Sequence, residues 1–509
     1  MRLKRTTGSQ FIVSVVASIL AVFLNYVITL VLTPYITENI GTEAYGFVSL
    51  AKTFANYASI FTVALNGFSA RYISIEYHKG DMKDANTYYN SVFIADLIIG
   101  VLIFAVAIIV IFNLDKFLSI PSKLVADVKM LFLLDTINFL ILSCSTAFMT
   151  ATTIKNRLEI GSWIKCISYV LEALFLVIVY KMLPPNVYYV GLGLIVSSAA
   201  ILVLNIYATV ELTPELKIQK GLFSRKAVRE LVKPGIWSSI NSLGNTLNSG
   251  LDLLITNIML SALQAGQLAI VETISTIFST LFSILATPYQ PIQLKYYAEG
   301  DKEKLVQSFK LGIKFNGMIS NIAFAGFAIF GAAYYKLWTP GQNITLLQSV
   351  STITILGCII QGAVYPLYYG YNLTLKNKVP CIITIISGLL NLTSMYFLIK
   401  YTNLGLYAVV GTTTVLSWLG DFIFNPMYLS HCLGLRKATF YPTLFRHIFS
   451  CLIMTFSFWG ISKIFWPKTW IQLIFIAILC AFIGAVIHIM VVMNKTELRQ
   501  GLHIVLRRK

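Results

Sequence analysis

Residues 11–33 of this chain have the sequence FIVSVVASILAVFLNYVITLVLT. The run contains no charged residue, and its helix would be about 35 Å long, enough to cross a hydrocarbon core of about 30 Å. Basic residues precede it within residues 1–5, and no small-residue cleavage site follows it. We therefore expect a retained transmembrane helix rather than a cleaved signal peptide.

Segments of the same kind recur along the whole chain, of which 57% is hydrophobic and only 12% charged. Soluble chains carry roughly 25% charged residues. Spans are expected at 11–33, 46–68, 91–112, 129–150, 160–180, 189–210, 236–258, 267–290, 311–333, 348–370, 380–400, 405–427, 445–464 and 471–493. The sequence thus predicts an all-α polytopic membrane protein with about 14 transmembrane helices.

The positive charges sort to one side of this predicted topology. Of the 39 lysine and arginine residues, 30 fall on the side that holds both termini, and these include all the arginines. Positive residues favour the cytoplasmic side, so we expect a multi-pass protein of the cytoplasmic (plasma) membrane with both termini in the cytoplasm. The net charge of +18 is then a consequence of topology, and no nucleic-acid partner is expected.

A shift of about 220 residues brings two parts of the chain into register. Gly80-Asp81 falls on Gly300-Asp301, and Lys155-Asn156-Arg157 falls near Lys376-Asn377-Lys378. Six spans separate equivalent positions, and an even number preserves orientation in the membrane. The pattern predicts two parallel six-helix repeats around a central cavity, two additional C-terminal helices, and alternating access by rocking of the repeats.

The expected domain organisation follows from this repeat. Residues 1–215 form an N-terminal six-helix lobe, and residues 236–430 form a C-terminal six-helix lobe. Residues 216–235 are expected to be a cytoplasmic amphipathic linker that is helical, because hydrophobic and basic residues alternate along it. Residues 431–509 contain the two extra helices and a basic cytoplasmic tail.

A polar stripe marks the seventh predicted span. It consists of Asn241, Asn245, Asn248 and Asp252, whose spacing places them on one face of a helix. A sparser stripe in the first span consists of Ser18, Asn25 and Thr29. Lipid cannot hydrate amides, so these faces are expected to point toward protein or water. They form either the wall of a substrate cavity that hydrogen-bonds sugar hydroxyls or hydrogen-bonded contacts between packed helices.

Lys52 and Glu272 occupy equivalent positions of the repeat, and each is followed by a threonine. An ionisable residue in a span costs about 2.5–3.5 kcal/mol on insertion scales. One interpretation is a charge pair that gates the outer half of the cleft. The other is that each side chain lies close enough to the membrane surface to extend into water.

Other charged residues divide into two candidate groups. The coupling-ion candidates, which would bind H⁺ or Na⁺, are Asp96, Asp135, Glu172 and Asp421. The candidates for contact with a lipid diphosphate are Arg71, Lys165 and Lys295. The alternatives are ordinary acid–base pairing at helix ends for the first group and the positive-inside bias for the second.

In these features the chain resembles the bacterial polysaccharide flippases of the multidrug/oligosaccharidyl-lipid/polysaccharide superfamily. The resemblance depends on the pattern IGTEAYG at residues 40–46, the basic loop after Arg71, the Lys155-Asn156-Arg157 loop and the two-lobe layout with two extra helices. It implies export of an undecaprenyl-diphosphate-linked repeat unit, ion coupling in many members, and a polysaccharide polymerase and glycosyltransferases in the same pathway. The substrate partners would be the lipid-linked oligosaccharide and membrane lipid.

Two further transport functions and one enzymatic function are alternatives. A lipid II flippase or a drug/cation antiporter would have the same architecture, although the first span has no acid of the kind that the drug-exporting branch often contains. A membrane polysaccharide polymerase or glycosyltransferase typically needs a large extramembrane loop, and none is expected here. The sequence contains no HExxH, P-loop or GxSxG motif, so we expect no enzyme, metal or cofactor.

Overall fold

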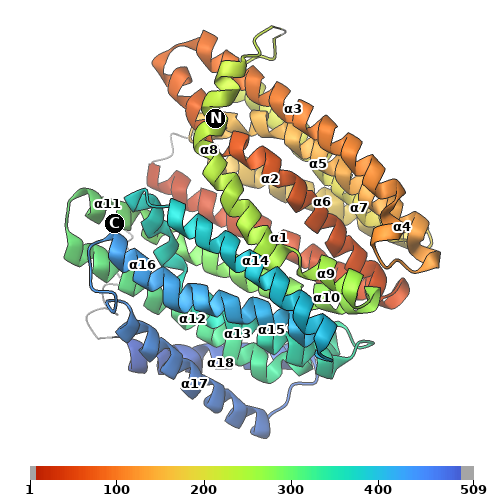
Figure 1. The fold of residues 1–509 in the computed structure, drawn as a ribbon, viewed down its shortest axis with the longest axis vertical. Coiled ribbons are helices and arrows are strands. Elements are labelled where there is room, and N and C mark those ends of the chain that lie inside the picture. The colour runs from red at the N-terminus through yellow and green to blue at the C-terminus, as the bar shows by residue number, and fades with distance from the viewer. Residues whose placement is uncertain (1–6, 220, 494–509) are drawn as a thin grey trace. The chain divides into compact units, whose positions relative to one another are not determined.

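The computed structural model describes residues 7–219 and 221–493, and every regular element in these ranges is a helix. The chain divides after Gly266 into two compact units (Figure 1). The predicted all-α fold is thereby confirmed. The basic tail expected at the C-terminus begins at residue 494 and lies outside the described residues.

The first unit contains the N-terminal series of helices. They are α1 (Thr7–Asn39), α2 (Thr42–Lys79), α3 (Met82–Phe112), α4 (Leu114–Phe117), η1 (Ser122–Leu124), α5 (Val125–Ile154), α6 (Leu158–Met182), α7 (Tyr188–Leu212), α8 (Arg225–Asn245), η2 (Thr246–Gly250) and α9 (Asp252–Met259). Helix α10 (Ala262–Ala286) begins in this unit and continues into the second.

The second unit contains the remaining helices. They are α11 (Tyr289–Ala298), α12 (Lys302–Trp338), α13 (Ile344–Thr374), α14 (Lys378–Tyr401), α15 (Leu406–Trp418), η3 (Leu419–Phe424), α16 (Asn425–Cys432), α17 (Tyr441–Ile464) and α18 (Trp470–Val492). Both η2 and η3 are π-helical turns, with one extra residue per turn relative to an α-helix.

Thirteen of the described helices are long and apolar enough to cross a membrane. The prediction of about 14 spans differs at residues 236–258, where the chain is helical but is divided among α8, η2 and α9. The asparagines in this segment lower its hydropathy, and a bend at Leu251 interrupts the helix. Several other helices are longer than expected. Helix α2 has 38 residues, or about 57 Å, so it must extend beyond the hydrocarbon core.

The helix boundaries confirm the internal repeat. Three pairs of helices begin 220 residues apart, at Thr42 and Ala262, Met82 and Lys302, and Leu158 and Lys378. The loops that precede α3 and α12 have the same conformation. Gly80 and Gly300 both adopt positive φ, at 83° and 71°. The carboxylates of Asp81 and Asp301 each accept the backbone N–H three residues later at 3.0 Å, as N-caps do.

The segment after α7 is not the helix that was predicted to begin at residue 216. Residues 216–219 and 221–224 are not helical, and α8 begins at Arg225. Side chains of α3 replace the missing helical hydrogen bonds: Asn86 accepts from the Lys217 N–H at 2.8 Å, and Asn90 accepts from the Gln219 N–H at 2.8 Å. These amides attach the non-helical segment to the first unit.

A phenol and a lysine fix the start of the same segment. The Tyr77 hydroxyl donates to the Glu215 carboxylate at 2.8 Å, and the Lys155 ammonium donates to the Tyr77 hydroxyl at 2.7 Å. A backbone N–H bond, the Tyr77 hydroxyl and the nearby Lys155 charge lower the pKa of Glu215 from its ordinary value. The loop therefore has a charged anchor on the first unit.

Helix α8 packs closely against α2 within the first unit (Figure 1). The contact point is Gly235, where an added Cβ would collide with the backbone carbonyl of Ala64. Such close approach between helices in lipid maximises van der Waals contact, which is a main source of helix association there. The start of the polar α8–η2–α9 segment is thus held against a long transmembrane helix.

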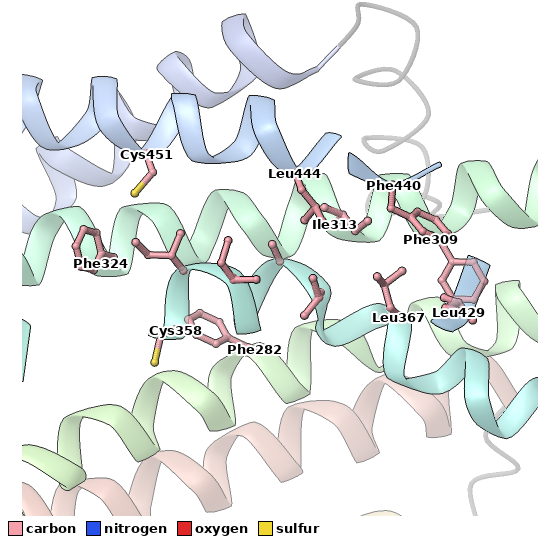
Figure 2. Packing of buried hydrophobic residues seen from close by; sticks show 14 of the residues in the cluster. Phe282, Phe309, Ile313, Phe324, Cys358, Leu367, Leu429, Phe440, Leu444 and Cys451 are labelled. Atoms are coloured by element: carbon pink, nitrogen blue, oxygen red, sulfur yellow. The ribbon is translucent and has the colours of Figure 1, made fainter. Parts of the chain in front are cut away.

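The second unit has a continuous hydrophobic core. Figure 2 shows Phe309, Ile313 and Phe324 along α12, with Leu444 of α17 on one side and Leu367 of α13 on the other. All five side chains are buried. This core attaches the first of the two C-terminal helices to the repeat.

Histidines complete the attachment of α17 and α18 to α12. His488 lies 2.9 Å from the Lys314 carbonyl and 3.2 Å from the Ser450 hydroxyl, so it has a polar partner on each neighbouring helix. The Asn321 side chain of α12 donates to the His447 carbonyl at 2.9 Å. Buried polar groups in a membrane must be paired within the protein, and these contacts pair both ring nitrogens of His488 and the amide nitrogen of Asn321.

Candidate functional site

The α8–η2–α9 segment is the most irregular helix of the first unit. Its π-turn spans Thr246–Gly250, and the Tyr57 hydroxyl of α2 donates to the Gly250 carbonyl at 2.5 Å. A π-turn leaves backbone carbonyls without their regular helical partners, and such turns are frequent at functional sites. Tyr57 therefore satisfies one carbonyl at this break.

The polar stripe of this segment is not packed uniformly. The side chains of Asn241 and Asn245 are exposed, Asn248 is half-buried, and Asp252 is buried at 6% exposure. Exposed amides on a helix among membrane spans are satisfied only by water or by a polar ligand. The N-terminal half of the stripe therefore has the chemistry to hydrogen-bond hydroxyl groups.

The stripe of the first span makes mostly local contacts. The Ser18 hydroxyl hydrogen-bonds the Ser162 hydroxyl of α6 at 2.8 Å, although both side chains remain accessible. The Thr29 hydroxyl donates to the Asn25 carbonyl at 3.2 Å. Asn25 and Thr29 are half-buried. Ser18 contributes to a helix–helix contact, and a substrate role for these residues stays a prediction.

Lys52 interacts with two of the predicted acids in the first unit. The buried carboxyls of Asp135 on α5 and Glu172 on α6 both experience its positive charge. Asp135 is 3% exposed and Glu172 is 5% exposed, whereas Lys52 is exposed. We refer to Lys52, Asp135 and Glu172 as the lysine–acid cluster. Burial disfavours the anion of both carboxyls most strongly, and the charge of Lys52 partly offsets that effect without a direct ion pair among the described residues.

Polar side chains that sequence analysis did not single out support this cluster. The Asn138 amide donates to Asp135 at 3.3 Å, and the Ser197 hydroxyl of α7 interacts with Glu172. The i, i+3 spacing of Asp135 and Asn138 was visible in the sequence. The approach of Ser197 depends on how α7 packs against α6, which no sequence pattern indicated.

Asp96 lies at a different site in the first unit. Its side chain is completely buried, and the Asn66 amide of α2 donates to it at 3.2 Å. Asn66 was not among the predicted site residues. Its only sequence signal was an amide within a predicted span.

Asp421 is the buried acid of the second unit, and it lies within the π-turn η3. The Tyr368 hydroxyl of α13 donates to Asp421 at 2.6 Å, and the Asn425 amide donates to it at 2.8 Å. The Tyr371 hydroxyl in turn donates to the Asn425 side chain at 2.7 Å. This hydrogen-bond network holds a carboxyl at a helix break, an arrangement suited to ion binding.

The remaining predicted residues do not come together at one site. Arg71, Lys165 and Lys295 are all exposed, and Lys295 lies 3.8 Å from Glu299. Glu272 is half-buried on α10 in the second unit, so its predicted pairing with Lys52 stays a prediction. The threonines that follow Lys52 and Glu272 do behave alike: each donates to the carbonyl four residues earlier.

Solved structures with the same fold are membrane transporters. The lipid II flippase MurJ in an inward closed conformation superposes with a TM-score of 0.70 at 16% identity, covering 94% of this chain and all of that one. An inward-facing multidrug resistance MATE family transporter of the MOP superfamily superposes with a TM-score of 0.68 at 16% identity, covering 81% of this chain and 96% of that one. These likenesses confirm the predicted fold.

Sequence comparison identifies the family. The uncharacterized membrane protein EpsK of Bacillus subtilis (strain 168) is 26% identical over 488 residues, which are 96% of each chain. The profile of the polysaccharide biosynthesis protein family matches residues 12–292, more than half of the 509 residues. This multi-pass membrane protein therefore belongs to the polysaccharide biosynthesis protein family, as the sequence features had indicated.

Proposed function

We propose that this protein is a flippase that moves lipid-linked oligosaccharide repeat units across the cytoplasmic membrane. The main support is the combination of membership in a polysaccharide biosynthesis family with the fold of a lipid II flippase. Surface polysaccharides are assembled from units that must cross a membrane, and a chain of transmembrane helices with no large soluble domain is suited to that step. Undecaprenyl diphosphate is the carrier that the family implies.

The sugar headgroup is assigned to the polar α8–η2–α9 segment. Asn241 and Asn245 present exposed amides, which donate and accept hydrogen bonds as sugar hydroxyls require. Asn248, Asp252 and the first-span stripe are further candidates. In the proposed alternating-access cycle the two repeats rock, and Lys52 and Glu272 close the outer gate. Exposed Arg71, Lys165 and Lys295 receive the diphosphate from the cytoplasmic side.

An ion gradient is proposed to drive the cycle. The buried carboxyls of Asp96, Asp135, Glu172 and Asp421 are the candidates for binding H⁺ or Na⁺. The proposed pathway partners are glycosyltransferases, which build the lipid-linked unit, and a polymerase, which consumes it. The proposed topology keeps both termini in the cytoplasm.

Deletion of the gene tests the assignment directly. We expect lipid-linked repeat units to accumulate on the cytoplasmic leaflet and surface polysaccharide to be lost. Expression of the wild-type protein should reverse both effects. Normal surface polysaccharide in the deletion strain would contradict the proposal.

The alternatives give different outcomes in the same strain. A lipid II flippase would cause loss of cell-wall precursor at the surface and lysis, with polysaccharide units affected only secondarily. A drug/cation antiporter, for which the MATE-like fold is the supporting observation, would leave polysaccharide intact and increase susceptibility to cationic drugs. A polymerase or glycosyltransferase would leave unpolymerised or incomplete units, respectively.

A paired substitution tests the role of the amide stripe. Replacing Asn241 and Asn245 by leucine removes the exposed hydrogen-bonding groups, and export should fall at least tenfold if each hydrogen bond contributes about 1 kcal/mol. A matched change to glutamine keeps the amides and should retain partial export. Equal export by the leucine and wild-type proteins, at equal amounts in the membrane, would remove this face from the substrate path.

A further inference from the structure

Asp96 and Asn66 form a buried polar pair between α3 and α2. Asp96 is 0% exposed, and it lies 14 residues after the start of α3, or about 21 Å along the helix axis. The Asn66 Nδ2 atom donates to Asp96 Oδ1 at 3.2 Å. The pair is therefore in the middle of two transmembrane helices, far from either helix end.

Each partner keeps one buried oxygen without a hydrogen bond. These atoms are Asp96 Oδ2 and Asn66 Oδ1. The other polar atom of each side chain, Asp96 Oδ1 or Asn66 Nδ2, makes the hydrogen bond between the two residues. An ionised Asp96 would leave two acceptors and no donor, and buried acceptors without donors are rare in folded proteins.

The side chains that face this part of α3 do not supply a counterion. The Cys144 thiol of α5 interacts with Asp96, whereas Tyr72 of α2 and Glu230 of α8 contact Tyr88, about two helical turns earlier on α3. None of these groups is a cation. Among residues 7–219 and 221–493, no lysine, arginine or histidine lies within ion-pair distance of Asp96.

We propose that Asp96 and Asn66 form a proton-binding site, with Asp96 protonated in the conformation described here. A proton from water binds to Asp96 Oδ2 and converts the carboxylate into a carboxylic acid. The new O–H donates to Asn66 Oδ1 while Asn66 Nδ2 still donates to Asp96 Oδ1. One proton thus satisfies both remaining oxygens and removes the buried charge.

A metal cation fits the site less well. Hard cations such as Ca²⁺ take six or more oxygen ligands, and only two free side-chain oxygens are found here. The described residues also contain no group of three or more His, Cys, Asp or Glu side chains that would hold a metal. A proton needs only one acceptor and one partner.

The proton would couple to transport through the α2–α3 contact. Protonated Asp96 closes a two-hydrogen-bond pair between the helices, whereas ionised Asp96 requires water and favours a conformation that opens the contact. This coupling role rests on the proposed flippase function. The protonation of Asp96 does not rest on that function, so the experiment that tests it must be independent of transport.

Infrared spectroscopy of the purified full-length protein tests the proton directly. At neutral pH the wild-type protein should show a carbonyl band of a protonated carboxylic acid that shifts in heavy water and on incorporation of isotopically labelled aspartate. Asp96→Asn should lose one such band, because an amide at position 96 reproduces both hydrogen bonds without a titratable group. The exposed Asp115 provides the matched control, and Asp115→Asn should leave the band unchanged.

Exchanging the two residues sharpens the test. The double variant Asn66→Asp, Asp96→Asn restores one acid and one amide at the same contact and should regain the band.

In reconstituted vesicles, Asp96→Asn should lose stimulation of export by a proton gradient. If the labelled wild-type protein has no aspartic acid band, or if Asp96→Asn keeps every band, the proposal is wrong. Stabilisation of the wild type by Na⁺, but not by K⁺, that disappears in Asp96→Asn would instead identify a sodium site.

Discussion

The first unit holds buried carboxyls in two contrasting environments. In the lysine–acid cluster, Lys52 supplies a positive charge to both Asp135 and Glu172. Asp96, like Asp135, has an amide partner, but no cation among the described residues contributes to its electrostatic environment. A positive charge near a buried carboxyl favours its anion, whereas burial without a cation favours the neutral acid. We therefore expect the two acids near Lys52 to hold a negative charge more readily than Asp96.

Removing the cation should have the largest effect on stability. Lys52→Met leaves two buried carboxyls without a positive partner. Because the charge of Lys52 acts on two buried carboxyls at once, we expect a loss on the order of 2 kcal/mol. Thermal unfolding in detergent measures it. The triple variant with Asp135→Asn and Glu172→Gln should recover most of the loss, and failure to recover would show that charge is not the cause.

At the Asp96–Asn66 pair, replacing Asn66 should destabilise the protein more than replacing Asp96. Asn66→Leu deprives Asp96 of its hydrogen bond and should destabilise the protein by about 1–3 kcal/mol. Asp96→Asn should change stability by less than about 0.5 kcal/mol, because the amide pair replaces the acid–amide pair. The two variants are compared in one unfolding experiment. A larger loss from Asp96→Asn than from Asn66→Leu would contradict the assigned protonation state.

Asp421 of the second unit provides an intermediate case, because both a phenol and an amide donate to it. Tyr368→Phe removes one donor and leaves Asn425 in place. We expect a loss of about 1 kcal/mol in unfolding free energy. Tyr365→Phe, on the same helix, is the control and should have no comparable effect. Equal effects of the two substitutions would indicate that ring packing, rather than the bond to Asp421, is responsible.

The smallest effect is expected where the carboxyl is exposed to water. The Tyr77 hydroxyl contributes to lowering the pKa of Glu215 from its ordinary value of 4.5. The bond therefore stabilises the folded protein fully above about pH 4.5. This stabilisation is lost as the pH falls through the lower pKa that Glu215 has in the folded protein. Tyr77→Phe should therefore destabilise the protein slightly at neutral pH and not at all in strong acid. Unfolding measured across this pH range tests the sign. A difference that persists unchanged in acid would exclude Glu215 as the partner.

The sequence was informative where hydrophobicity and repetition determine the structure. Long apolar runs located the helices, and the recurrence of Gly80-Asp81 at Gly300-Asp301 revealed the repeat because both loops need the same left-handed glycine and the same N-cap. The seventh span was less predictable. Its hydropathy suggested one continuous helix, whereas a π-turn, whose Gly250 carbonyl accepts a hydrogen bond from Tyr57, and a bend at Leu251 divide it.

The candidate sites were predictable only in part. Asp96, Asp135, Glu172 and Asp421 stood out because acids are rare in spans. Their partners did not, since Asn66, Ser197 and Tyr368 are ordinary polar residues whose role depends on which helices pack together. The linker shows the same limit: an amphipathic helix was expected from residue 216, but Asn86 and Asn90 of α3 hydrogen-bond the backbone of residues 217 and 219, which are not helical.

Reconstitution of the purified protein in lipid vesicles measures the proposed activity most directly. A lipid-linked oligosaccharide is placed in the inner leaflet, and its exposure outside is followed with a membrane-impermeant sugar oxidase. We expect the sugar to become accessible much faster than in protein-free vesicles, and faster still with a proton gradient across the membrane. Accessibility equal to that of protein-free vesicles under every gradient, with correctly folded protein present, would contradict the assignment of this protein as a flippase.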